Sequence, residues 1–451
     1  MWLSPMVEYE PTEASLSTHA VPEWFHDAKL GIFIHWGPYS VPGWADHEKG
    51  HPYAEWYPRN MYEPGTPTYD YHRETYGKDV EYLDFVEEWT AENWDPDRWA
   101  EFFADVGARY VVLTGEHHDG FPLWPSHYQR YNAAEMGPER DIVGELCRAV
   151  REQGLRFAAS YHANLNYYQP GFEGPFGHPD VRGTASKYHA ETDEESFRPG
   201  PEYVDFMNAK HRELIRQYEP DMLWFDTPHA DDETVRAREL IADYYEQAAE
   251  WGKEVLVNNR SATDVDGDIH TPEYELLEEI DEEKWELCRG IGRSFGFNRR
   301  EGPEEHLSGK ELVHLLADVV SKNGNLLINV GPRADGTIPK FQREPLETLG
   351  AWLDVHGEAI YGTTYWKQSE DESASVEVRY TRRGDTLYAI CLAWPGPSLT
   401  LDGPEPDRAR LLGTAEQMVD RVGSQTRVSL PETPPAERTA YVVALDGAAS
   451  H

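Results

Sequence analysis

Two carboxylates in this sequence have the type and setting that cleavage of a glycosidic bond requires. Asp226 ends the apolar run from Met222, and Glu273 follows Pro272 in a later loop. Such cleavage needs two carboxyl groups that flank the bond, one as acid or base and one as nucleophile or second base. An aspartate that ends a strand caps the next turn about as often as it serves in catalysis, so a structural role for Asp226 is the alternative. The loop of Glu273 also carries other acids, so chemistry alone does not select the pair: Glu275, Glu278 and Glu279.

His117 and His118 lie between Glu116 and Asp119, which raises the question of a metal site. Adjacent residues of an extended chain point to opposite faces, so both imidazoles would not reach one ion without a bend. The spacing matches no known zinc motif such as H-E-x-x-H. We therefore predict no metal here. Neutral imidazoles that bind sugar hydroxyls are the favoured interpretation, and plain structural histidines are the alternative.

The segment from Tyr53 to Tyr57 combines an acid with aromatic rings in a loop rich in Pro and Gly. Glu55 and Trp56 could bind the hydroxyls of a sugar and stack on its ring. An ordinary packed loop has the same composition. The segment is consistent with a pocket wall without requiring one.

Short apolar runs alternate with longer amphipathic stretches, such as those from Ile142 to Gln153 and from Glu311 to Lys322, which is typical of repeated βα units. Polar or aromatic residues follow most of the predicted strands, as functional residues do in a (β/α)8 barrel. A doubly wound sheet is the alternative, but no G-x-G-x-x-G turn is present. The predicted strands run from Leu30 to Trp36, Tyr110 to Thr114, Arg156 to Tyr161, Met222 to Asp226, Val255 to Asn258 and Asn325 to Val330.

After about Tyr365 the sequence changes to alternating apolar and polar residues around the turn Arg383-Gly384-Asp385. This alternation predicts β-hairpins. We therefore expect a catalytic (β/α)8-like TIM barrel over residues 1–364 and an antiparallel β-sandwich over residues 365–451.

The composition is strongly acidic, with 82 Asp and Glu against 41 Lys and Arg among 451 residues and a net charge of −41. This charge argues against binding to nucleic acid or to an anionic membrane. Dispersed acidic residues favour solubility in strong salt, so the protein resembles those of salt-adapted organisms and should loosen at low ionic strength. Three scattered cysteines and the absence of a long apolar run predict a cytoplasmic protein with no membrane partner, and a homo-oligomer is compatible with the sequence.

The motifs, taken together and in order, resemble the α-L-fucosidases of glycoside hydrolase family 29. The resemblance implies an irregular barrel followed by a β-sandwich, a retaining mechanism on a fucosylated glycan, and neither metal nor cofactor. It spans roughly residues 22 to 363. The matching segments are WFHDAKLGIFIHWGPYSVPGWA (24–45), YAEWY (53–57), YVVLTGEHHDGFPLWPS (110–126), LWFD (223–226), VNNR (257–260), HTPEY (270–274), KWELCRGIGRSFGFNRREG (284–302) and VSKNGNLLINVGPRADGTI (320–338).

Carried over position by position, the resemblance makes Asp226 the nucleophile and Glu273 the general acid/base. The third strand departs from the family pattern, since it reads Ser160-Tyr161-His162 where Tyr-Tyr-Ser is usual. Asn259 stands where Asp is frequent, and Thr227-Pro228 where glycine is common. The resemblance implies fucose contacts at His35, Glu55, Trp56, His117, His118, Tyr161, Trp224, Arg260 and Phe295.

Two rival functions stay open at this point. A catalytically silent relative could keep the pocket and only bind fucose. A hydrolase of the same fold could act on another deoxy- or galacto-configured sugar. Assays with aryl glycosides separate both from the expected hydrolysis of terminal α-L-fucosyl linkages.

Overall fold

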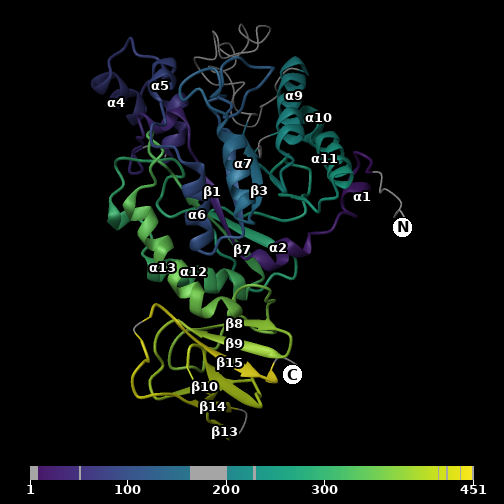
Figure 1. The fold of residues 1–451 in the computed structure, drawn as a ribbon, viewed down its shortest axis with the longest axis vertical. Coiled ribbons are helices and arrows are strands. Elements are labelled where there is room, and N and C mark those ends of the chain that lie inside the picture. Colours follow the sequence, from purple (N-terminus) through teal and green to yellow (C-terminus); the bar gives the residue numbers. More distant parts are fainter. Residues whose placement is uncertain are drawn as a thin grey trace.

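The chain folds into a large α/β part and a smaller β part, stacked along the long axis of the molecule (Figure 1). The computed structural model describes residues 9–49, 52–162, 201–226, 230–414, 416–422, 425–436 and 438–448. In these ranges no helix has the length and apolar character that a membrane span needs.

A seven-stranded parallel sheet forms the centre of the large part, in the order β5-β4-β3-β2-β1-β7-β6. Its strands are buried on both faces, which explains their nearly continuous apolar sequence. They are β1 (Leu30–Ile34), β2 (Tyr110–Glu116), β3 (Arg156–Tyr161), β4 (Met222–Phe225), β5 (Leu256–Val257), β6 (Trp285–Gly290) and β7 (Gly324–Val330).

An irregular segment, residues 269–273, fills the position between the edge strands β5 and β6. It makes parallel bridges from Ile269 to Asn258 on one side and from Glu273 to Cys288 on the other. The curled sheet is thereby continued by a segment that is not a regular strand. This geometry confirms the predicted TIM-barrel-like fold and brings Glu273 to the rim of the barrel.

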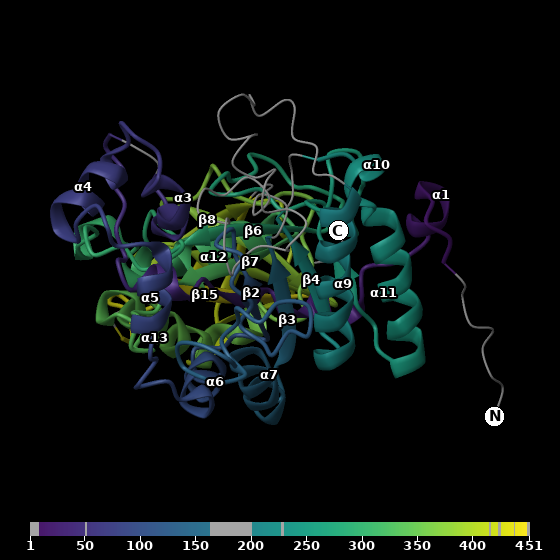
Figure 2. The same cartoon turned by 90° about the horizontal axis from the view of Figure 1, so that it is seen from above.

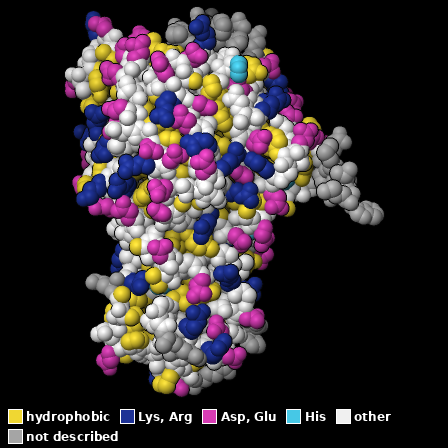
Figure 3. Space-filling view, in the orientation of Figure 1, with side chains coloured by type: hydrophobic (Ala, Val, Ile, Leu, Met, Phe, Trp, Pro, Cys, Tyr) yellow, Lys and Arg dark blue, Asp and Glu magenta, His cyan; other side chains and the backbone are white. Residues whose placement is uncertain are grey.

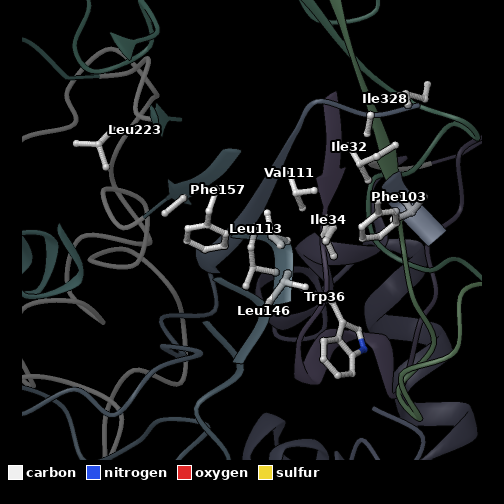
Figure 4. Packing of buried hydrophobic residues seen from close by; sticks show 14 of the residues in the cluster. Ile32, Ile34, Trp36, Phe103, Val111, Leu113, Leu146, Phe157, Leu223 and Ile328 are labelled. Atoms are coloured by element: carbon white, nitrogen blue, oxygen red, sulfur yellow. The ribbon is translucent and has the colours of Figure 1, made fainter. Parts of the chain in front are cut away.

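Side chains alternate between the two faces of the curled sheet. Phe33, Trp224 and Cys288 belong to the apolar cluster inside the barrel. The alternate residues of the strands pack against the surrounding helices in the main core, and Ile32, Ile34, Val111, Phe157 and Leu223 among them are labelled in Figure 4. The parity of a residue within its strand therefore decides whether it faces the barrel interior or the helices.

The helices lie around the parallel sheet when the molecule is seen from above (Figure 2). Several begin at side-chain caps; Ser308 and Glu311, for example, form a capping box at the start of α12. The helices are α1 (Glu13–Leu16), α2 (Glu23–Ala28), α3 (Tyr57–Asn60), α4 (Pro67–Thr75), α5 (Tyr82–Glu88), α6 (Pro96–Asp105), α7 (Ile142–Glu152), α9 (Pro201–Tyr218), α10 (Asp232–Val235), α11 (Ala237–Trp251), α12 (Gly309–Ser321) and α13 (Lys340–His356), with 3-10 turns at Pro38–Ser40, Ala54–Trp56, Pro303–Glu305 and Gly357–Ala359.

Two antiparallel sheets form the C-terminal part, in the orders β12-β11-β15-β9-β8 and β10-β14-β13. One face of the five-stranded sheet contributes Ile390 and Val442 to the main core beside α12 and α13, and a separate apolar cluster fills the sandwich. The strands are β8 (Val378–Arg383), β9 (Thr386–Cys391), β10 (Ser398–Asp402), β11 (Arg408–Leu411), β12 (Glu416–Gln417), β13 (Val419–Val422), β14 (Gln425–Ser429) and β15 (Tyr441–Asp446).

The predicted hairpin is confirmed, because β8 and β9 pair in antiparallel register on either side of Gly384 and Asp385. The proposed domain boundary between residues 364 and 365 stays a prediction. Among the seven parallel strands, β6 is the one that the sequence patterns did not identify, because Glu286 and Arg289 interrupt its apolar sequence.

Candidate active site

A pocket opens where the carboxyl ends of the parallel strands meet. His35 follows β1, His117 and His118 follow β2, His162 follows β3 and Asp226 follows β4. Parallel strands bring the residues that follow them to one end of a barrel. The pocket has a cavity volume of about 110 Å³. Its full lining is Phe33, His35, Tyr53, Glu55, Trp56, His117, His118, His162, Trp224, Asp226, Arg260, Glu273, Cys288 and Phe295.

Asp226 is held in its ionised form by two neighbours. Its Oδ1 lies 2.5 Å from Nη2 of Arg260, and its Oδ2 lies 3.2 Å from Nδ1 of His162. Burial works to raise the pKa of this carboxyl, but the Arg260 charge and His162 outweigh burial and hold the pKa well below its usual range. A carboxylate that stays ionised in a pocket is suited to attack an electrophilic carbon.

Glu273 reaches the pocket from the irregular segment between β5 and β6. The Tyr53 hydroxyl donates to its Oε1 at 2.6 Å, and Arg260 donates to its Oε2 at 3.1 Å. Tyr274, the next residue, has a left-handed backbone with φ of 57°. Its hydroxyl contacts the carbonyl of Arg293 at 2.9 Å. These contacts fix the loop, so the position of Glu273 is set by contacts with three other segments of the chain.

Arg260 connects the two carboxylates through a single nitrogen. Nη2 lies 2.5 Å from Asp226 and 3.1 Å from Glu273, and the guanidinium carbon lies 5.2 Å from the centre of the Trp224 ring. Burial opposes the charge of this guanidinium, yet the two carboxylates raise its pKa above the ordinary value. The contact also limits the distance between the two carboxylate oxygens, which cannot exceed the sum of the two separations.

Four imidazoles, from His35, His117, His118 and His162, form one wall of the pocket. Burial lowers the pKa of His35 and of His118 to about 3, and burial holds the pKa of His117 well below its ordinary value. These three rings are therefore neutral at physiological pH. A neutral imidazole has one donor and one acceptor nitrogen, as a partner for sugar hydroxyls must.

The tautomers of two of these rings follow from their partners. His118 Nδ1 lies 2.9 Å from the carbonyl oxygen of His162, so that nitrogen carries the proton. Asn329 donates its amide to the carbonyl of Phe295, which turns its Oδ1 toward Nδ1 of His35 at 2.7 Å. In both rings Nε2 is left as an acceptor. Each of these two nitrogens can accept a hydrogen bond from a hydroxyl group of a bound sugar.

The expectation that His117 and His118 point apart is wrong, because strand β2 ends at Glu116 and the chain turns immediately afterwards. The amide of Gly120 bonds to the carbonyl of His117 at 2.9 Å, and the two histidine rings lie 4.4 Å apart. Both rings line the pocket. Nitrogen and oxygen atoms of two sets approach within 4.8 Å of one another, a spacing that could hold a metal ion: His35, His117 and His162, and His118, His162 and Asp226. The absence of a metal stays a prediction.

Glu55 and Trp56 line the pocket, which favours a pocket wall over an ordinary packed loop for the segment from Tyr53 to Tyr57. Oε2 of Glu55 accepts from the amide of Gly296 at 2.8 Å, and burial raises the pKa of its carboxyl to about 7. The Trp56 ring lies edge-on to His118 with centroids 4.7 Å apart. The pocket therefore has a third acid besides Asp226 and Glu273, and this one is buried and can bind a hydroxyl.

The structure corrects the expected sugar contact at Tyr161. Its side chain points away from the pocket, donates to the carbonyl of Met207 at 3.4 Å and packs on the His211 ring. Residues alternate along β3, so Tyr161 faces the helices, whereas Ser160 and His162 face the interior. His162 takes the position expected for Tyr161, with Nε2 at 2.5 Å from Oγ of Ser160.

The pocket also contains residues that the sequence reasoning did not select: Phe33, Tyr53, His162 and Cys288. Phe33 lies two residues before His35 and so faces the same side of the sheet, and His162 has the same relation to Ser160 on β3. Both could therefore be identified from the sequence. Tyr53 required the loop geometry, and Cys288 lies on strand β6, which the sequence patterns did not identify. Thr227 and Pro228, which depart from the family pattern, lie outside the described residues.

The chain is similar to known α-L-fucosidases along nearly its whole length. The family model described as Alpha-L-fucosidase matches residues 4–358. Tissue alpha-L-fucosidase of Bos taurus is 32% identical over 444 residues, covering 95% of this chain and 88% of that protein. Plasma alpha-L-fucosidase of Homo sapiens is 34% identical over 401 residues, covering 86% and 79%.

Solved structures give the same result. The crystal structure of Thermotoga maritima alpha-fucosidase in complex with fucose has a TM-score of 0.83 and 39% sequence identity to this chain, and the match covers 97% of this chain and 100% of that one. The same protein in complex with a mechanism-based inhibitor has a TM-score of 0.84.

Proposed function

This chain belongs to the α-L-fucosidase family of glycoside hydrolases, and from that membership we propose that it cleaves terminal α-L-fucosyl linkages of oligosaccharides or glycoconjugates with retention of configuration. Asp226 attacks the anomeric carbon and forms a covalent fucosyl ester while Glu273 protonates the leaving oxygen. Glu273 then takes a proton from water, which attacks the same carbon and releases fucose and the Asp226 carboxylate.

The short path from Asp226 through Arg260 to Glu273 is the observation that supports retention. One nitrogen contacts both carboxylates at 2.5 and 3.1 Å, which limits the separation of the two oxygens. Retaining glycosidases place their carboxyl groups about 5–5.5 Å apart, whereas inverting enzymes need about 6.5–9.5 Å to admit a water molecule. A short distance between these two oxygens therefore supports the first class.

The remaining lining suits a deoxy sugar. Neutral histidines offer donors and acceptors for hydroxyl groups, and Glu55 adds a buried carboxyl. The ring centre of Phe33 lies 4.9 Å from that of Trp224 and 4.5 Å from that of His35. The ring centre of Phe295 lies 5.0 Å from that of His35. These aromatic rings provide an apolar surface beside the polar groups. L-fucose combines hydroxyls with a C6 methyl group and matches both surfaces.

The nucleophile is tested by Asp226→Gly with an aryl α-L-fucoside. Turnover should disappear, because no ester can form, and added azide should restore it by attacking the anomeric carbon in the space left by the carboxylate. The product should be the β-fucosyl azide, identified by NMR. Wild-type-like turnover without azide would remove Asp226 from the mechanism.

The acid/base has a matched control within the same loop. Glu273→Gln should slow cleavage of substrates with poor leaving groups, whereas Glu275→Gln should not, because Glu275 is exposed and does not line the pocket. Equal losses in the two variants would contradict the assignment. A panel of aryl α-L-fucosides and aryl α-L-galactosides tests the sugar, since the apolar surface favours the methyl group that fucose carries on C5 over the hydroxymethyl group of galactose.

We further propose that the protein is adapted to salt and is cytoplasmic. The net charge of −41 supports the first part, and Figure 3 shows acidic side chains scattered over the visible face. Repulsion among them should lower the melting temperature in dilute buffer, and about 1 M KCl should raise it by screening the charges. A melting temperature independent of KCl would overturn this part. Three buried, free cysteines fit a reducing compartment, which fractionation of the source cells would test.

A further inference from the structure

Glu286 is a buried acid that the reaction does not use. It lies on β6 with no exposed surface. Its neighbours Trp285 and Leu287 belong to the main core on the helix side, so strand alternation directs Glu286 into the barrel with Cys288. Cys288 lines the pocket, and Glu286 lies two residues before it on the same face of the strand. Glu286 therefore lies in the layer beneath the pocket floor.

Both carboxylate oxygens of Glu286 have a defined partner. Oε1 accepts from the indole Nε1 of Trp224 at 3.0 Å, and Oε2 accepts from the hydroxyl of Tyr110. Burial raises the pKa of this carboxyl to about 7, although both donors and the Lys284 charge act to lower it. An acid in this position is costly to bury, and an apolar residue of similar size would fill the same space. The two hydrogen bonds give the acid a role that packing alone would not require.

The contact with Trp224 leads directly to the reacting groups. Trp224 forms part of the pocket lining and lies under the Arg260 guanidinium, whose carbon is 5.2 Å from the ring centre. Arg260 in turn contacts Asp226 and Glu273. Nε1 is the only polar group of an indole, so it is the only atom whose hydrogen bond could fix the rotation of the ring about the Cβ–Cγ bond. The hydrogen bond from Nε1 to Glu286 therefore sets the plane on which Arg260 rests.

We propose that Glu286 is a positioning residue that acts through Trp224 and Arg260 to hold the two catalytic carboxylates in register. This inference rests on the roles proposed for Asp226 and Glu273. Loss of the Glu286 acceptor frees the indole to turn, and the guanidinium above it then no longer meets both carboxylates. Displacements of about 1 Å at a reacting centre can cost about a hundredfold in rate. The effect should appear mainly in kcat, because Arg260 contacts the two reacting carboxylates.

The test compares Glu286→Leu, Glu286→Gln and Tyr110→Phe with an aryl α-L-fucoside. Glu286→Leu should lower kcat at least about tenfold with little change in KM. Glu286→Gln keeps an oxygen acceptor for the indole and should recover most of the activity. Tyr110→Phe removes the other partner of the same carboxyl but leaves the bond to Trp224, so its kcat should stay within about twofold of the wild type.

A double-mutant cycle makes the test independent of general destabilisation. In a Trp224→Phe background, Glu286→Gln and Glu286→Leu should cause no further loss of kcat, because the indole N–H is already absent. Melting temperatures are measured for every variant. Full activity of Glu286→Leu, an equal loss in Tyr110→Phe, or additive losses in the cycle would each overturn the proposal. Failure of the proposed catalytic roles would appear separately, as turnover by Asp226→Gly without azide.

Discussion

The hydroxyl of Tyr53 lies 2.6 Å from Oε1 of Glu273 and donates to it, across more than two hundred residues of sequence. This bond holds the carboxyl by one oxygen while Arg260 holds the other. Glu273 is thus oriented before any substrate binds. An acid that must deliver its proton to one oxygen of the substrate depends on such orientation.

Tyr53→Phe should therefore impair proton delivery while leaving the nucleophile intact. We expect kcat/KM for phenyl α-L-fucoside to fall by about tenfold, which corresponds to the loss of one hydrogen bond that orients the acid. The loss should be much smaller for 2,4-dinitrophenyl fucoside, whose leaving group needs no protonation. The slope of log kcat/KM against leaving-group pKa measures the difference, and equal losses for both substrates would contradict a role through Glu273.

Arg260→Lys should be damaging despite conserving the charge. A lysine ammonium is a compact group that cannot lie flat on Trp224 and also meet the oxygens of both Asp226 and Glu273 in the geometry of a guanidinium. We expect kcat/KM to fall by about a hundredfold, as for a displaced reacting group. Azide should rescue this variant poorly, because Asp226 still occupies its place. Activity close to the wild type would show that charge alone suffices.

Acid should destabilise the folded protein through its buried histidines. His35 and His118 have folded-state pKa values of about 3, whereas an unfolded histidine titrates at about 6.5. Between these values the unfolded chain binds more protons at these two positions, so their contribution to the free energy of unfolding is lost as the pH falls below about 6.5. Glu55 and Glu286, whose folded-state pKa values are about 7, contribute with the opposite sign, so the histidine contribution is measured by comparison with a variant. As the pH falls from about 6.5 to about 4, the double variant His35→Gln/His118→Gln should lose less melting temperature than the wild type, and an identical slope would contradict this.

The sequence predicts most of the barrel because its strands are buried on both faces and read as apolar runs. The sequence patterns do not identify β6, because Glu286 is polar and yet faces the barrel interior. Asp226 and His35 are accessible to prediction because each directly follows a recognisable strand. The motif resemblance, and not chemistry, selected Glu273 from its acidic neighbours.

Two features of the site depend on contacts that no sequence pattern contains. The segment that carries Glu273 is not a regular strand, and its place between β5 and β6 rests on isolated bridges. The approach of Tyr53 to Glu273 depends on how a long loop packs over the barrel. Which residues of β3 face the barrel interior, by contrast, follows from the alternation of side chains alone. Applied to Ala158, which lies inside the barrel, alternation assigns His162 and not Tyr161 to the pocket.

His162 and Tyr161 therefore offer a direct comparison of neighbouring residues. His162→Ala removes the imidazole 3.2 Å from Asp226 and weakens the support of the nucleophile, so kcat should fall by about tenfold to a hundredfold. Tyr161→Phe removes only a hydroxyl that contacts the Met207 carbonyl among the helices, and KM for an aryl α-L-fucoside should not change. Its melting temperature should fall slightly, because one hydrogen bond is lost. A rise in KM for Tyr161→Phe together with normal kinetics for His162→Ala would restore Tyr161 as the sugar contact.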